Sequence, residues 1–579
     1  MLLDTVGRGI GEFVVMKKAL LVVVVLALLA AAGALLFLGK RGISDGAALL
    51  PANTVIYAAI PDVARTSQRW PQTALAKIAA EPAVAEFFAR PLTTFGAGGG
   101  GEAAEILARL KPGRFFVALT SLGDAPPEGV LGFQYFGGQE SLTAAMERLH
   151  AELAARFPSE SRSTSDYHGV TITSFGGPMA GVHTASHGNW GLLASSEAAL
   201  QGMLDRAAGR DTSDSLASSE VFRKVMSQLP SEPDFVWFAD FQPIFDLLLR
   251  VGEQQGGDVN EAQIAQIRKL KAAGGSLLFA GEDQREMSFA LMDDIPKLPA
   301  LNHALMELTV PDTTVFIESA VDRETISSED YLQTLPEPVQ EFLADAQLDG
   351  GRLASVLGDE MGAILKWGAG AMIPSVLVGV TIEDRARVDE IVTGAVARDD
   401  LDVTVRESHG AKVFEFPSFG GLQLVSPAVA ITDRFLLASL TIDELERVLD
   451  SNDGGKDAKT LKDSEAFKPA LDLYRGSNQA FAFIDAKTIF ENIYNQLRPI
   501  LVIAGTMSPD MAKVIDVEKL PDTEVISRHL SPILYTNRQT ADGIIVESSG
   551  PITFSQGAGL VGVGAAFFIV SQLGATFGN

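Results

Sequence analysis

The sequence contains no cysteine, and this absence removes several classes of site at once. A chain without cysteine forms no disulfide framework, holds no zinc–thiolate centre and offers no thiolate nucleophile. Histidine is also scarce, with seven residues in 579. The absence of thiols leaves the compartment open, because such a chain is indifferent to the redox conditions around it.

Basic residues are few compared with acidic ones, and the formal net charge is −27. Residues 1–41 hold five basic and two acidic residues, so the rest of the chain carries −30. A body this acidic repels nucleic-acid phosphates and anionic lipid headgroups, and we expect no nucleic-acid partner. The length predicts two or three domains, and the apolar fraction of 47% indicates a globular chain.

One apolar run near the start, Ala19–Gly39, has no charged residue over 21 positions. At 1.5 Å per residue this length covers the hydrocarbon core of a bilayer, about 30 Å thick. A cleaved signal peptide is the alternative, because alanines within the run offer a small-residue cleavage site. The run continues past those alanines, which favours an uncleaved transmembrane anchor.

The charges around this run set its expected orientation. Lysines precede the span and Lys40 and Arg41 follow it, and Met16 is an alternative start of the chain. With that start, the positive-inside rule mildly favours a cytoplasmic N-terminus. The sequence thus predicts a cytoplasmic segment 1–18 and a linker 40–46. The bulk of the chain is expected on the extracytoplasmic, periplasmic side of a bacterial cytoplasmic membrane, as a single-pass protein.

The C-terminal segment 551–579 has no charged residue and is rich in glycine. Within it, 557–573 is an apolar run of a length at the lower limit for a membrane span. The glycines in this run suit close packing of helices. Two interpretations are open: a second membrane helix, or a tail that docks on the body.

Phrases of the sequence recur in the same order about 250 residues apart. The stretch "LLPANTVIYAAIPD" that begins at Leu49 returns as "LTVPDTTVFIESAVD" from Leu308, and "DYHGVTITSF" returns as "ESHGAKVFEF". The helical-looking "GLLASSEAALQGML" and the later "FADFQPIF" have counterparts as well. Repeated order at a similar spacing, with the drift that insertions produce, is typical of internal duplication, here 47–296 and 306–550.

Each predicted repeat reads as mixed helix and strand. Short β-branched or aromatic runs bounded by Pro, Gly and Asp predict strands, for example "NTVIYAAI", "RFFVALTSL" and "VLGFQYF". The segment 140–157 places Leu142, Met146 and Leu149 on one helical stripe. The predicted fold class is therefore α+β, with two similar lobes, each a largely antiparallel sheet with packed helices.

These features together resemble a bacterial membrane-anchored family catalogued as domain of unknown function three-three-five-two. The resemblance rests on the anchor, the opening "LLPANTVIYAAIPD", the following "TALAKIAAEPAVAEFF" and the doubled body. It covers most of the body but includes no specific motif. The family brings no catalytic residues, so the resemblance implies no chemistry.

Two matching triplets are the candidate ligand-binding residues: Asp166 with His168, and Glu407 with His409, each followed by glycine. Residues two apart on a strand share a face, so an acid and an imidazole there could interact. The alternative is a turn in which glycine takes a positive φ between polar residues. No catalytic residue is assigned.

Four recurring aspartates, Asp62, Asp322, Asp240 and Asp485, each lie where a predicted strand runs into a helix. Aspartate at such a position caps the exposed N–H groups of the helix. We expect capping, and a catalytic carboxylate pair is the alternative.

The sequence predicts no cofactor and no metal. "GAGGGG" at 96–101 matches a dinucleotide fingerprint by letter, but it follows a predicted helix and loop rather than a strand. His183 and His187 are four apart in a predicted strand, which separates them by about 13 Å.

These features favour a membrane-anchored binding or scaffold protein that holds an apolar ligand or an envelope partner between two lobes. The chain is expected not to be an enzyme. One alternative is an envelope hydrolase that uses the recurring acid–histidine pairs. Another is a structural subunit of an envelope complex, which the glycine-rich C-terminal segment would favour.

Overall fold

The computed structural model describes residues 44–94, 109–122, 126–157, 162–177, 180–254, 268–295, 297–328, 340, 344, 349–396, 403–417, 425–453, 459–507 and 516–556. The chain divides into two compact units. The first comprises residues 1–77, 88–294 and 542–545, and the second comprises 78–87, 295–541 and 546–579. The predicted apolar spans 19–39 and 557–573, the segment 1–18 and the glycine run 96–101 lie outside the described residues.

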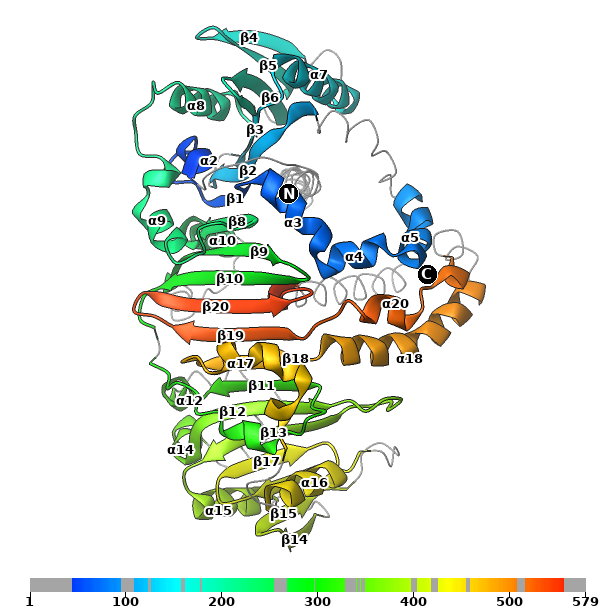
Figure 1. The fold of residues 1–579 in the computed structure, drawn as a ribbon. Coiled ribbons are helices and arrows are strands. Elements are labelled where there is room, and N and C mark those ends of the chain that lie inside the picture. The colour runs from blue at the N-terminus through cyan, green and yellow to red at the C-terminus, as the bar shows by residue number, and fades with distance from the viewer. Residues whose placement is uncertain are drawn as a thin grey trace, which may run out of the picture. The chain divides into compact units, whose positions relative to one another are not determined.

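The first half of the chain alternates strands with short helices (Figure 1). Its strands are β1 (Ile56–Ile60), β2 (Pro112–Ser121), β3 (Glu128–Tyr135), β4 (Ser163–Tyr167), β5 (Val170–Gly177), β6 (Ala180–His187), β7 (Trp190–Ala194), β8 (Phe235–Asp240), β9 (Leu270–Ala280) and β10 (Asp283–Met292). Its helices are α2 (Ser44–Ala48), α3 (Val63–Arg69), η1 (Trp70–Gln72), α4 (Ala74–Ala80), α5 (Pro82–Thr94), α7 (Gln139–Arg156), α8 (Glu197–Ala207), η3 (Leu216–Ser218), α9 (Glu220–Met226) and α10 (Phe241–Gln254).

The second half follows the same alternation. Its strands are β11 (Val315–Ala320), β12 (Leu357–Lys366), β13 (Ser375–Ile382), β14 (Thr404–Ser408), β15 (Ala411–Glu415), β16 (Ala428–Ile431), β17 (Phe435–Ser439), β18 (Ala480–Ile484), β19 (Ile533–Gln539) and β20 (Gly543–Gly550). Its helices are η4 (Ala304–Leu308), α12 (Arg323–Ser327), α14 (Gly350–Val356), α15 (Arg385–Val396), α16 (Ile442–Asp453), η6 (Leu461–Asp463), η7 (Glu465–Ala470), α17 (Leu471–Tyr474), α18 (Ala486–Met507), η8 (Val517–Lys519) and α20 (Thr523–Ser527).

Each unit is built on an antiparallel sheet, so the chain is α+β as predicted. In the first unit the strands pair in the order β4-β5-β6-β7-β3-β2-β1-β8-β9-β10. In the second they pair in the order β14-β15-β16-β17-β13-β12-β11-β18-β19, with β20 next to β19. The two orders correspond strand for strand.

The helices follow the same strands in each unit. A helix comes after β3 and after β13, another after β7 and after β17, and a third after β8 and after β18. The predicted stripe of α7 is partly confirmed: Leu142 is buried and Met146 packs against its small cluster. On α8, Leu200, Met203 and Leu204 are all buried, as the helical spacing predicts.

A separate hydrophobic core stabilises each unit. In the first, Tyr57, Phe116 and Phe238 of neighbouring strands are almost fully buried with the inner face of α8. In the second unit, Phe316, Phe481 and Phe483 are fully buried together with residues of α16 and η7. Burying an aromatic or aliphatic side chain contributes about 1.5–3 kcal/mol, so these clusters supply most of the driving force for folding.

Two of the predicted boundaries fall next to structured segments. The end of the predicted linker 40–46 is helical, because Ser44–Ala48 forms α2 and Gly46 packs into the core. A Cβ at Gly46 would lie 2.9 Å from Phe116, so only glycine fits there. The predicted C-terminal segment also begins inside the second unit, since Pro551 and Thr553 are buried. Among the described residues, no helix is both long enough and apolar enough to cross a membrane.

The four recurring aspartates cap helices, as predicted. Asp62 accepts a hydrogen bond from the Arg65 amide at 2.9 Å, and Asp322 accepts one from the Thr325 amide at 3.0 Å. The equivalent bonds of the other two carboxylates are Asp240 with the Gln242 amide at 3.0 Å and Asp485 with the Thr488 amide at 3.1 Å. Each carboxylate therefore satisfies an N–H group at the start of a helix.

Replacing a cap should have a small and specific cost. We expect Asp322→Ala to lower the free energy of unfolding by about 1 kcal/mol, because the first turn of α12 loses its acceptor. Asp322→Asn, which keeps a side-chain oxygen, should cost only a few tenths of that. Urea unfolding of the two variants measures the difference, and equal losses would contradict the capping role.

Candidate functional site

The predicted residues Asp166 and His168 lie at the tip of the hairpin that joins β4 to β5. His168 and Gly169 have φ values of 54° and 83°, which confirms the turn. The Asp166 carboxylate accepts a hydrogen bond from the Gly169 amide at 3.1 Å, so it serves the turn. Both Asp166 and His168 are exposed.

Glu407 and His409 lie in the equivalent turn between β14 and β15. His409 and Gly410 have φ values of 49° and 75°, and Glu407 and His409 are exposed. Two consecutive residues at positive φ are typical of a two-residue hairpin turn that follows the twist of its strands. The two turns thus repeat a structural feature, and neither acid–histidine pair lies in a concave site.

A cavity of about 310 Å³ lies in the second unit, beside the ends of three neighbouring strands. Pro311, Asp312 and Thr313 precede β11, residues 366–369 include the end of β12 and the turn after it, and Phe483 and Asp485 lie at the end of β18 and just beyond it. Its remaining walls come from η6, η7 and α18: Leu461, Ser464, Ala466, Thr488, Glu491 and Asn492. This mixture of apolar and polar walls is usual for a small-molecule site.

The first unit has a smaller cavity of about 220 Å³ between β2, β3 and α8. It is lined by Pro51, Thr120, Glu128, Val130, Ala198, Ala199, Gly202, Met203 and Arg206. Glu128 already accepts a hydrogen bond from the Ser196 hydroxyl at 2.6 Å. The larger cavity of the second unit is therefore the stronger candidate.

A second unusual feature is a buried acidic cluster on β11 and β12. Glu360 is 2% exposed, and its carboxylate accepts hydrogen bonds from three consecutive backbone amides, those of Asn302, His303 and Ala304. His303 has a left-handed backbone, with φ 62°. That conformation turns successive N–H groups toward one point, where they form a concave site for an anion. Glu360 therefore holds the start of η4 against β12.

Glu318 lies beside this site and is fully buried. One carboxylate oxygen bonds to the His303 ring, while its Oε2 and the Tyr474 hydroxyl have no partner among the described residues. Burial raises the pKa of the Glu318 carboxyl, and the hydrogen bond from His303 opposes that rise. Burial also raises the pKa of Tyr474, helped by the charges of Glu318 and Glu360.

Glu318 should make stability depend on pH. Because its pKa is raised in the folded state, the folded chain holds the proton more tightly than the unfolded chain. The resulting stability is complete below the ordinary value of 4.5 and is lost as pH rises through the folded value. We expect the stability of wild type to fall more steeply than that of Glu318→Gln as pH rises above 4.5. Parallel curves from urea unfolding at several pH values would contradict this.

The acidic cluster was missed at the level of sequence. Glu318 stands two residues from both Phe316 and Ala320, which are buried, so strand alternation places it on the inner face. A charged residue at an inward position is the signal that could have identified it. His303 and Tyr474 carry no comparable signal, because they reach the cluster from a linker and a short helix.

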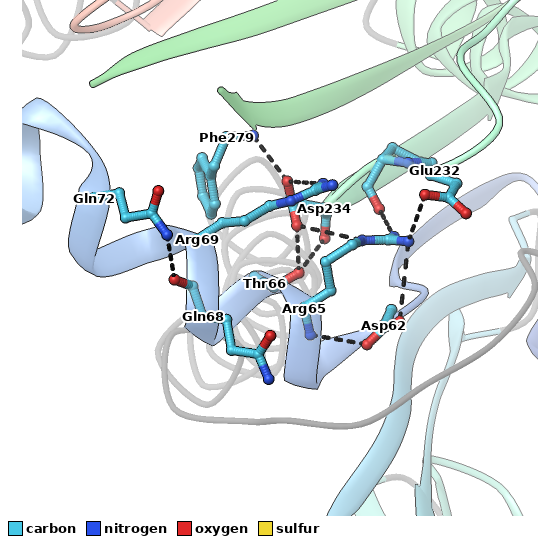
Figure 2. A network of polar contacts seen from close by, with 10 residues as sticks. Asp62, Arg65, Thr66, Gln68, Arg69, Gln72, Glu232, Asp234 and Phe279 are labelled. Carbon is cyan, nitrogen blue, oxygen red and sulfur yellow. Dashed lines mark hydrogen bonds and ion pairs between the residues drawn. The ribbon is translucent and has the colours of Figure 1, made fainter. Parts of the chain in front are cut away.

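Figure 2 shows a polar network in the first unit, where side chains of α3 point toward Asp234 before β8. Asp234 is fully buried and accepts hydrogen bonds from the Thr66 hydroxyl at 3.0 Å, Arg69 Nη1 at 3.2 Å and the Phe279 amide at 2.8 Å. Arg65 donates to the carbonyl of Pro233 at 2.6 Å. These hydrogen bonds all join residues of the first unit to one another, so the network anchors α3 to β8 and β9.

The second unit uses the same kind of anchor at the start of β18. Gln479 accepts a hydrogen bond from the Gln539 amide at 2.7 Å, much as Asp234 accepts one from Phe279. An amide oxygen thus replaces the carboxylate. This one bond of the network therefore recurs in the second unit.

The described residues contain no group of three or more acidic or histidine side chains that could hold a metal ion. His183 lies on β6 and bonds through Nδ1 to the Ser174 hydroxyl at 2.8 Å. Burial lowers the pKa of His183, which favours its neutral form. His183 therefore stabilises the sheet.

Comparisons with known proteins add little. No family model matches the sequence, and no curated protein matches it. Two solved structures, described as crystal forms I and III of TP0453, align with 9% and 12% identity and a TM-score of 0.25 each. The alignments cover 43% and 45% of this chain and 80% and 84% of the other. At that score they carry no argument, and the family resemblance stays a prediction.

Proposed function

We propose that this protein is a binding protein held at the extracytoplasmic face of a bacterial membrane by Ala19–Gly39. The observation that carries the binding role is the cavity of about 310 Å³ in the second unit. Its lining includes the fully buried apolar side chains of Leu461 and Phe483. Polar side chains such as those of Thr313, Thr488 and Asn492 also line it, so a small ligand would be both held and oriented there.

We further propose that the two units arose by duplication. The matching strand orders and the shared anchors at Asp234 and Gln479 support this. The registers pair Tyr57 with Phe238 in the first unit and Phe316 with Phe483 in the second, so the buried Ala59 stands where the second copy has Glu318. The buried acidic cluster would then be a feature of the second copy alone, which agrees with a specialised second unit.

The membrane placement can be tested because the chain has no cysteine. Single-cysteine variants Thr5→Cys and Met372→Cys, in the full chain, would be exposed to a membrane-impermeant maleimide in intact cells. Met372 is 80% exposed. We expect labelling at 372 in intact cells and at 5 only after lysis. Labelling of both positions in intact cells, or of neither, would overturn this topology.

A scaffold role is the second candidate, and the surface of α18 favours it. Ile493, Leu497, Ile500 and Leu501 are exposed and follow a helical spacing, so they form one apolar face. A photo-crosslinking residue at Ile500 should capture an envelope partner in cells. The same residue at the exposed Asp433, on another surface of the unit, is the control and should capture none.

A further inference from the structure

One face of the sheet in the second unit carries apolar side chains that are open to solvent. Ile317 on β11 is 40% exposed, and Met361 on β12 and Val378 on β13 are each 45% exposed. These strands lie side by side (Figure 1), and their register places Ile317 opposite Ala363 and Ala363 opposite Val378. The intervening residues of the same strands point to the other face, where they form the core.

This surface, which we call the open face, consists of three rows of facing residues. The rows pass through Val315, Ile317 and Ser319 on β11 and cross β12, β13 and β17. Their side chains are valine, leucine, isoleucine, methionine, alanine and one serine, so no charged group belongs to the described residues of the open face. An antiparallel sheet with one face in water normally alternates apolar and polar residues. An uncharged exposed face is therefore unusual in a chain with a net charge of −27, and it marks an interaction surface.

Other parts of the second unit pack at both borders of the open face. At one border, Leu436 of β17 packs against the small core under α15. At the other, Ala482 of β18 and then Tyr535 of β19 continue the row of Ile317. The Phe554 ring packs on the Tyr535 ring, with the two centroids 4.8 Å apart. The described residues end at 556, so the chain leaves them beside the open face.

The segment that follows, 557–573, has the composition and the length to cover this face. It contains no charged residue and consists mainly of glycine, alanine, valine and phenylalanine. The distance across the four strand spacings from β19 to β13 is about 19 Å. A helix of this length would extend about 25 Å, and an extended chain would extend further, so the segment can reach across the open face. Docking there would remove two uncharged surfaces from water at once.

We propose that residues 557–573 dock on the open face and cover Ile317, Ala363 and Val378. The partner of this surface is therefore a segment of the same chain. The proposal does not depend on the cavity, and it selects the docked tail over a second membrane helix. It also places the C-terminus on the same side of the membrane as the second unit.

A photo-crosslinking residue at Val378 tests this docking in the full-length chain. Val378 is 45% exposed, so a larger side chain fits there without entering the core. We expect a crosslinked product with the mass of one chain, in which position 378 is joined to 557–573. The same residue at Asp433, whose side chain is 85% exposed, is the control and should give no such link. A crosslinked dimer would assign the face to a second copy, and a link to another protein, to lipid or to nothing would also overturn the proposal.

Maleimide labelling measures how well the segment covers the face. The thiol of Val378→Cys should react slowly in the full-length chain, which has no other cysteine. Adding Phe568→Asp and Ile569→Asp should make it react about tenfold faster, because charges in the segment oppose its burial. Thr576→Asp, beyond the segment, is the control and should change nothing. Equal reaction rates with and without the two charges would contradict the docking.

The location of the C-terminus separates docking from a membrane span, and this step rests on the membrane placement proposed above. Gly578→Cys should react with a membrane-impermeant maleimide in intact cells, as Met372→Cys should. Labelling of Gly578→Cys only after lysis, with Met372→Cys labelled before it, would show a membrane span and overturn the docking. If neither variant reacts in intact cells, the membrane placement fails, and the crosslink at Val378 still decides the docking.

Discussion

Glu360→Ala is expected to lower the free energy of unfolding of the second unit by about 3–5 kcal/mol. The substitution leaves the backbone amides of Asn302, His303 and Ala304 without their shared acceptor. The Glu360 carboxylate is buried, so water that enters in its place restores these hydrogen bonds only in part. The cost of an unsatisfied buried N–H group is about 1–3 kcal/mol, and here three are affected.

Two further variants test whether the lost hydrogen bonds to the backbone amides cause this destabilisation. Glu360→Gln keeps one carbonyl oxygen and should fall between wild type and Glu360→Ala. Glu307→Ala removes a carboxylate from η4 itself, where Glu307 pairs with Arg434 on the surface, and should cost under about 1 kcal/mol. Hydrogen exchange of peptides from β11 and β12 during urea unfolding measures all three. Equal losses for Glu360→Ala and Glu307→Ala would contradict the anchoring role of Glu360.

Asp234→Ala is expected to have a comparable effect on the first unit, about 3–4 kcal/mol. The Phe279 amide and the Thr66 hydroxyl would lose a buried acceptor, and Arg69 would lose its anion. As Figure 2 shows, these groups come from α3 and β9, so the loss should loosen the helix from the sheet. Peptides of α3 should exchange hydrogen faster before the rest of the unit unfolds.

The surface control for this network is Glu232. Its carboxylate is 74% exposed and lies 3.7 Å from Arg65 Nη1, so Glu232→Ala should cost under about 1 kcal/mol. Asp234→Asn should be intermediate, because an amide oxygen still accepts from the Phe279 amide, as Gln479 does from Gln539. An Asp234→Ala protein as stable as Glu232→Ala would show that the network is not needed to hold α3.

The sequence predicted the features that depend on local order. Strand alternation and turn residues located β1, β2 and β3, and helical spacing located α7 and α8. The capping aspartates and the glycine turns were also predicted correctly, because both follow from a few adjacent residues. The two orders of strands could not be predicted, since pairing between distant strands leaves no local pattern.

The candidate site depends on residues that are distant in the sequence, which is why no sequence pattern pointed to it. Asp166 and His168 looked significant because they recur, yet recurrence at a turn reflects the fold. The cavity, in contrast, combines segments near 312, 367, 461 and 491. No local sequence pattern marks these segments, and only the folded chain brings Glu491 and Asn492 beside Phe483.

The most direct test of the binding role is native mass spectrometry of the full-length chain, purified in mild detergent and compared with Ala466→Trp. Ala466 is an exposed residue of η7 at the cavity wall, so the larger side chain should block the cavity without disturbing the core. The account predicts a small molecule bound at one per chain in wild type and absent from the variant. A wild-type protein that carries no such molecule, or a variant that retains it, would contradict the binding role of this cavity.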